Sequence, residues 1–178
     1  TFGNVKIEDQ LNNYEITSEK IIYDKKNGIL KSFDETQIYY NNKYNIVSSD
    51  ISFNNNKKIF SSTKNTSIQD GFNNKFEFSS FNFDLIGKTI KAEKIKLIDA
   101  ENNILELNKS YIDLKNNQIV GSDFTLNFNK GIFGNPENDP RLIGRSIISN
   151  KSKTSMKKSS FTTCKNVEGK CPAWAISA

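Results

Sequence analysis

A short alternation of apolar and polar residues recurs about every 12 to 17 positions, and this recurrence most constrains the fold. In each copy two bulky apolar or aromatic side chains stand two positions apart. The copies are Ile21–Tyr23, Ile38–Tyr40, Ile51–Phe53, Phe81–Phe83, Ile95–Leu97, Ile112–Leu114 and Phe124–Leu126. Since successive side chains of a strand point to opposite faces, each copy predicts a strand with one buried face.

A second spacing links these copies into larger units. A small residue precedes four of the copies by three positions: Ser18, Ser48, Ala92 and Gly121. These four copies lie about 30 residues apart, or share a partner copy at that distance. Such a period is typical of a stacked repeat, in which each strand–turn–strand unit buries its apolar face only against its neighbours. We therefore predict an all-β fold, a rolled stack of antiparallel strand pairs with an apolar interior, forming one domain over residues 1–178.

Residues typical of turns separate the predicted strands, and no segment combines a helix cap with helical apolar spacing. The clearest turns are Asp24–Gly28, Asn54–Lys58, Asp99–Asn103 and Lys115–Asn117. After residue 130 the composition changes, and residues 131–144 indicate a loop followed by a stretch rich in Ser and Lys. We expect the last strands near Thr154–Met156, Ser160–Thr163 and Trp174–Ile176.

Composition excludes several classes of function. The formal net charge is +5, but the lysines are distributed along strands and turns, which favours a solvated surface over a nucleic-acid-binding stripe. A mean hydropathy of −0.60, without any apolar run of about 18 residues, excludes a membrane-spanning helix. The chain has no histidine, which is the usual general base. Carboxylate pairs such as Asp84 and Asp99 are no evidence for catalysis, because the sequence does not give the distance between their side chains. We therefore expect no enzymatic activity, no catalytic residue, no metal and no cofactor.

The alternation is compatible with two kinds of interior. The inward side chains can fill a packed core, or they can line a groove for an apolar ligand between the faces of a rolled sheet.

Cys164 and Cys171 enclose six residues and favour disulfide chemistry over metal binding or catalysis, with two buried thiols as the alternative.

The C-terminal part carries a more specific signal. Asn138–Ser146 is followed by Phe161–Cys164 and then by Cys171-Pro172-Ala173-Trp174-Ala175-Ile176. These motifs resemble the segment that closes the N-terminal periplasmic, OstA-like domain of the LptD family of lipopolysaccharide-assembly proteins. The upstream units of about 30 residues are similar to the OstA-like repeat that this family shares with LptA and LptC.

The resemblance implies a β-jellyroll at the periplasmic face of the outer membrane of a Gram-negative cell. It implies lipopolysaccharide transport, with acyl chains bound in an apolar groove and docking onto LptA by edge-strand addition. LptE and a following outer-membrane barrel of the same chain are implied as further partners. The groove residues are then Ile21, Tyr23, Ile38, Tyr40, Ile51, Phe53, Phe81, Phe83, Ile95, Leu97, Ile112, Leu114, Phe124 and Leu126.

The resemblance also implies disulfide bonds from Cys164 and Cys171 to cysteines of that barrel, with a Cys164–Cys171 bond as the alternative. Thr1–Asn4 has no signal-peptide character and the chain ends in a predicted strand, so we expect a piece of a longer protein.

Two other functions fit the pattern. One is a soluble LptA-like bridge protein, against which the cysteine- and Trp174-containing tail speaks. The other is a structural or adhesive β-solenoid with a fully packed interior.

Overall fold

In the computed structural model the chain forms one antiparallel β-structure, described for residues 2–11, 13–167 and 175–177. None of these residues forms a helix, so the all-β prediction is confirmed, and no membrane-spanning helix occurs among them. The strands are β1 (Phe2–Asp9), β2 (Tyr14–Asp24), β3 (Ile29–Tyr40), β4 (Tyr44–Ser48), β5 (Ser52–Asn54), β6 (Ile59–Ser62), β7 (Thr66–Gln69), β8 (Lys75–Phe78), β9 (Ser80–Asp84), β10 (Thr89–Ile98), β11 (Ile104–Asp113), β12 (Gln118–Asn127), β13 (Arg141–Ser149), β14 (Thr154–Thr162) and β15 (Ile176–Ser177).

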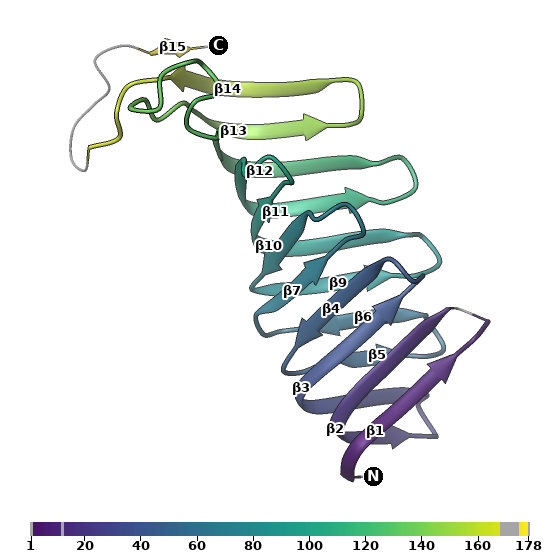
Figure 1. Ribbon diagram of the computed structural model, residues 1–178. Coiled ribbons are helices and arrows are strands. Elements are labelled where there is room, and N and C mark those ends of the chain that lie inside the picture. The colour runs from purple at the N-terminus through teal and green to yellow at the C-terminus, as the bar shows by residue number, and fades with distance from the viewer. Residues whose placement is uncertain (1, 12, 168–174, 178) are drawn as a thin grey trace.

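The strands stack from the N-terminal to the C-terminal end in a sheet that is rolled into two facing legs (Figure 1). The long strands β2, β3 and β10 to β14 run through both legs. The short strands β4, β7 and β8 continue the first leg, and β5, β6 and β9 continue the second. The two paths rejoin at β10, which pairs with β8 through residues 96–98 and with β9 through residues 89–93.

Long strands bend where they pass from one leg to the other. The backbone there takes positive φ angles between 48° and 67° at residues that are not glycine, namely Asp34, Lys94, Asp123 and Lys158. Positive φ angles are uncommon at non-glycine residues in strands. A residue in this left-handed conformation changes the direction of the strand, as a β-bulge does. The bend is therefore built into the backbone of β3, β10, β12 and β14, at intervals close to the 30-residue period or, between Asp34 and Lys94, to twice that period.

The small residues of the repeat lie inside these bends. Ser18, Ser48, Ala92 and Gly121 are all buried. Because the two legs converge at the bend, the space between the strands admits only short side chains there. The period seen in the sequence is thus the period of the bend.

The hairpin turns at one end of the strands recur with the same period of about 30 residues. Asp24, Asn54, Asp84 and Asp113 each accept backbone N–H groups of the following turn, at 2.9 to 3.1 Å. This is the usual reason for Asn and Asp in turns, because the side chain replaces a backbone partner. At the opposite end, short turns join β3 to β4, β7 to β8 and β10 to β11, but residues 128–140 form a much longer connection between β12 and β13.

The structure corrects the predicted strands at several places. None of the predicted copies lies in β1, β4, β6, β7, β8 or β13, β13 begins inside the predicted loop 131–144, and β14 is a single strand where two short strands were expected. Ile51 and Leu114 lie just outside β5 and β11. In β13 and β14 small residues and lysines interrupt the apolar alternation, so the pattern was not recognised.

Candidate functional site

The inner faces of the two legs carry two continuous apolar rows. Register neighbours on the first leg form the row Ile7, Ile16, Ile38, Ile46, Ile68, Phe76, Leu97, Leu105, Leu126, Leu142 and Phe161. On the second leg the row is Tyr23, Leu30, Phe53, Phe60, Phe83, Ile90, Ile112 and Ile119. The alternation in the sequence therefore builds one apolar interior between the legs.

The interior is closed around β5, β6 and β9. Rings of the first leg meet rings of the second: Tyr14 lies 5.4 Å from both Phe53 and Phe60, and Tyr40 lies 5.5 Å from Phe83, measured between ring centroids. Phe53 and Phe60 stack at 4.3 Å. Edge-to-face and offset ring contacts of this kind add to the free energy of burial.

A cavity with a volume of about 30 Å³ lies between the closed legs. Its lining is wholly apolar: Tyr44, Ile46, Ile68, Phe76, Phe78, Phe83, Ile90, Ile112 and Leu114. This is about the volume of one water molecule, whereas a pocket for a small organic ligand takes roughly 300 Å³ or more. The closed region therefore leaves no room for an acyl chain unless the legs separate.

Towards the C-terminal end the interior opens. Five inner-face residues of β12 to β14 are only partly buried although their side chains are large and apolar, and we call them the open mouth: Ile119, Leu126, Leu142, Met156 and Phe161. Within the described part of the chain, β13 and β14 continue the first-leg row, whereas the second-leg row ends there in the polar residues Ser149 and Thr154. A partly exposed apolar face of this kind is suited to bind an apolar chain.

The long connection 128–140 lies beside the open mouth. Phe128 and Phe133 pack against Phe161, with ring centroids 6.4 and 5.7 Å away, while Ile132 and Phe133 remain about half exposed. The base of the connection is held by Asp139, whose Oδ1 lies 2.8 Å from Lys130 Nζ. The hydrogen bond from Lys130 lowers the pKa of Asp139 below its ordinary value of 3.8, so the carboxylate keeps its charge to a lower pH than a free aspartate does, and the link is lost as the pH falls through that lowered pKa.

The C-terminal residues are tied to the same region. Arg141 is buried and donates from Nη1 to the carbonyl oxygens of Asp139 and Cys164, at 3.1 and 2.6 Å. The backbone N–H of Asn166 donates to Asp139 Oδ2 at 2.8 Å. Cys171 and Trp174 lie outside the described residues, so the disulfide pairing stays a prediction.

The structure places most of the predicted groove residues on the inner face. Ten of them are buried, namely Ile21, Ile38, Tyr40, Ile51, Phe53, Phe81, Phe83, Ile95, Ile112 and Phe124. Leu97, Leu114 and Leu126 are partly buried. Tyr23 is 53% exposed because it is the last residue of the second-leg row, and the register of β1 with β2 does not reach it. Whether any of the fourteen contacts a lipid stays a prediction. Leu142 was not predicted because β13 was not expected, and Met156 and Phe161 were not predicted because the short strands expected there show no pair of apolar residues two positions apart.

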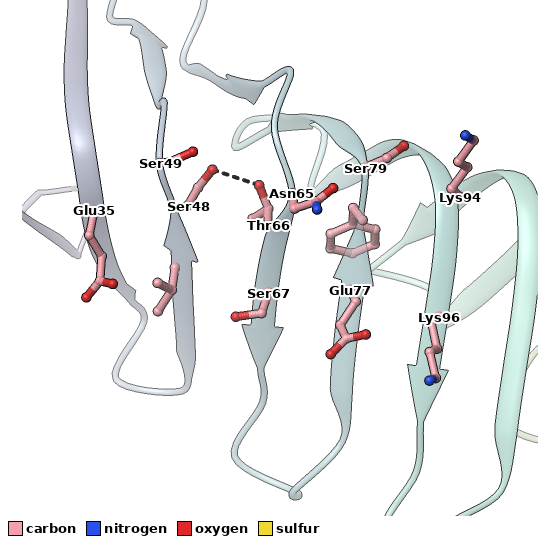
Figure 2. Close-up of a pocket in the computed structure, with 12 residues that line it drawn as sticks. Glu35, Ser48, Ser49, Asn65, Thr66, Ser67, Glu77, Ser79, Lys94 and Lys96 are labelled. Atoms are coloured by element: carbon pink, nitrogen blue, oxygen red, sulfur yellow. Dashed lines mark hydrogen bonds between the residues drawn. The ribbon is translucent and has the colours of Figure 1, made fainter.

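Two hollows lie where the legs bend. The first, of about 670 Å³, is open and is lined by hydroxyl groups, by Glu35 and Glu77, and by Lys94 and Lys96 of β10 (Figure 2). Figure 2 shows Thr66 donating to Ser48, at 2.9 Å, at the back of this hollow. The second hollow, of about 740 Å³, lies at the bend of β12, β13 and β14. Among the described residues no group of three or more His, Cys, Asp and Glu side chains is arranged to hold a metal ion.

No known protein family and no curated protein matches the sequence. The fold does match solved structures. One is LptH from Pseudomonas aeruginosa, described as the LptA-homologous periplasmic component of the lipopolysaccharide transport device, with a TM-score of 0.57 and 12% identity over 64% of this chain and 85% of LptH. The predicted OstA-like β-jellyroll is therefore confirmed as the fold. The neighbour is LptA-like, and the finer assignment to the LptD family is not tested by it.

Proposed function

We propose that this protein carries an acylated amphiphile as a non-enzymatic component of lipopolysaccharide transport in the periplasm. The observation that carries the proposal is the open mouth, where five large apolar side chains are left partly exposed at the C-terminal end of the apolar interior. Burial of apolar surface is worth roughly 25 cal/mol per Å², so acyl chains laid on this face would bind without any covalent step. The LptA-like fold supports the same role.

The ends of the stack support a bridging role. Among the residues that the structure describes, β1 pairs with β2 alone, and β14 with the two-residue β15 forms the other edge of the sheet. An exposed strand edge offers unpaired N–H and C=O groups to a strand of another chain. We propose that another sheet of the same fold continues the ladder at one or both ends, as an LptA-like bridge requires.

The particular place in the transport system is a second proposal. The motifs at Asn138–Ser146 and Phe161–Cys164 favour the periplasmic domain of the LptD family, with LptE and an outer-membrane barrel as its partners, over a free bridge protein. In the fold these two motifs are brought together, because Asp139 N–H donates to the carbonyl oxygen of Thr163 at 3.2 Å. An adhesive β-solenoid remains the alternative that the closed part of the interior favours.

Site-specific photo-crosslinking tests the carrier function. A photo-reactive amino acid at Leu126 or Leu142 should capture lipopolysaccharide, because both side chains lie in the open mouth. The same group at Phe53, which is 2% exposed and surrounded by rings, should capture much less. Thr125 is the matched control, since it adjoins Leu126 in β12 and points to the opposite face.

Capture from Thr125 as strong as from Leu126 would mean contact with the outer surface and would contradict the carrier function. Absence of capture from both Leu126 and Leu142, with the protein folded, would favour the solenoid. Strong capture from Phe53 would show instead that the legs separate to admit the ligand, and that the open mouth is only its entrance.

A further inference from the structure

The connection 128–140 places two large apolar side chains beside the open mouth. Ile132 and Phe133 stand at its tip and are 51% and 52% exposed. The ring centroid of Phe133 lies 5.7 Å from that of Phe161, which is the register neighbour of Leu142 in the first-leg row. Since this row faces the interior, the ring of Phe133 meets the open mouth from the inner side and not from the outer surface of the sheet.

The base of the connection is fixed to the body of the stack. The backbone N–H of Asn129 donates to Asn103 Oδ1 at 2.9 Å, and its side-chain amide donates to the carbonyl oxygen of Glu101 at 2.8 Å. At the other end of the connection Asp139 holds Lys130 by the ion pair described above. Both ends are therefore anchored by polar contacts next to the strands.

The tip is held in a different way, and we call residues 131–134 the flap. Gly131 and Gly134 enclose it with φ angles of +98° and +78°, a region that side-chain-bearing residues rarely adopt. The printed register of the sheet does not include these residues, and the N–H of Gly134 donates within the flap, to the carbonyl oxygen of Gly131 at 2.8 Å. The position of the flap thus depends on two glycine conformations and on the ring contacts of Phe133.

The flap lies where the second leg supplies no apolar side chains. Around β5, β6 and β9 the rings of one leg meet the rings of the other. In β13 and β14 the first-leg row continues, whereas the second-leg row of the described residues ends in Ser149 and Thr154. Ile132 and Phe133 are large apolar side chains that can take the place of the missing row. Because both remain about half exposed, the flap does not itself fill the mouth.

We infer that the flap is the second wall of the open mouth, and that Ile132 and Phe133 cover an acyl chain laid on Leu142 and Phe161. The inference rests on the proposed carrier function and adds to it the residues that enclose the ligand. An acyl chain between two apolar walls loses contact with water on both sides, so binding gains the exposed area of the flap as well as that of the row.

Calorimetric titration with dodecyl maltoside below its critical micelle concentration tests the flap. The double variant Ile132→Ser/Phe133→Ser should bind this detergent about tenfold more weakly than the wild type, because the apolar contacts of one wall are lost. The matched control is Leu11→Ser/Phe72→Ser. It also removes one aliphatic and one aromatic side chain, 98% and 66% exposed, from turns at the same end of the strands. The control should bind as the wild type does.

A second variant tests the position of the flap without removing any apolar side chain. In Gly131→Ala/Gly134→Ala no atom lies within 4 Å of either added Cβ, so the substitutions act only through the backbone. Because alanine disfavours both φ angles, the flap should move away from Phe161 and binding should weaken about threefold or more. Gly3→Ala is the control, since Gly3 also has a positive φ of 80° and open space around an added Cβ, but lies in β1.

Several results would overturn the flap as a wall. Wild-type affinity in Ile132→Ser/Phe133→Ser would show that the ligand does not touch it, and higher affinity would show that the flap blocks the mouth. Equal weakening in Leu11→Ser/Phe72→Ser or in Gly3→Ala would show that the effect is not local. In each case the wild type still binds, so the carrier function stands. If the wild type binds no dodecyl maltoside, the carrier function fails and the flap inference fails with it.

Discussion

At the scale of single residues, glycine controls how closely the strands of the open end approach each other. Gly121 and Gly144 lie on the inner face, and neither has a positive φ. A Cβ added at Gly121 would meet Leu107 Cδ2 at 2.6 Å, and one at Gly144 would meet Phe124 Cε1 at 2.5 Å. These glycines are therefore required by side-chain packing across the strands and not by backbone conformation.

Substitution of Gly144 by alanine should lower the free energy of unfolding by about 1 to 3 kcal/mol, because the methyl group displaces the buried ring of Phe124. Chemical denaturation measures this. Gly71→Ala is the control, since the atom nearest to its added Cβ is Cγ of Lys43, at 3.2 Å, on a flexible side chain. Equal effects of the two substitutions would show that the contact with Phe124 is not what restricts position 144.

At the scale of the elements, buried hydroxyl groups join the strands at the bend. Thr36 of β3 is fully buried, and its Oγ1 lies 3.1 Å from Ser18 Oγ of β2 and 2.7 Å from Ser32 Oγ. Ser32 Oγ in turn accepts the N–H of Ile51, at 3.0 Å. A second group, Ser48, Ser62 and Thr66, repeats the arrangement one unit later. The hydroxyls satisfy backbone groups that the bend removes from regular pairing.

Thr36→Val should destabilise the protein by about 1 to 3 kcal/mol although the shapes of the two side chains are similar, because the hydroxyls of Ser18 and Ser32 lose a buried partner. Thermal and urea unfolding check this. The outward-facing Thr17 provides the comparison, since Thr17→Val should change the stability by no more than about 0.5 kcal/mol. A tolerated Thr36→Val would mean that the bend is held by the backbone alone.

At the scale of the whole molecule, the stack is closed at one end and open at the other. Rings join the two legs around β5, β6 and β9, whereas the inner face of β13 and β14 is only partly covered. The strands of both regions are paired within the sheet, and β13 has partners on both sides. The difference in stability along the stack must therefore come from side-chain burial.

Native-state hydrogen exchange should detect this difference. Amides of β4, which has partners on both sides, should exchange about tenfold or more slowly than amides of β13, because opening of β13 exposes little additional apolar surface. Addition of a bound amphiphile should slow exchange in β13 and leave β4 unchanged. Equal protection of the two strands in the free protein would contradict the description of an open mouth.

The local pattern in the sequence was sufficient for the fold class because each feature of it acts locally. Alternation at Phe81–Phe83 or Phe124–Leu126 determines which side chains share a face. Asp and Asn at the turn positions accept hydrogen bonds from residues only two to four positions away. The small residues Ser48 and Gly121 indicate the period without any knowledge of the partner strands.

The sequence by itself thus determined an all-β stack of repeated, bent strands and a set of inward-facing apolar residues. Only the tertiary structure decided how far apart the two legs stand at each level. That separation closes the interior around Phe53 and Phe60 but leaves Leu142 and Phe161 partly exposed, although all four belong to the same kind of row. The reason is physical: alternation specifies the face of a side chain, whereas its burial depends on what a strand far away in the sequence places opposite it.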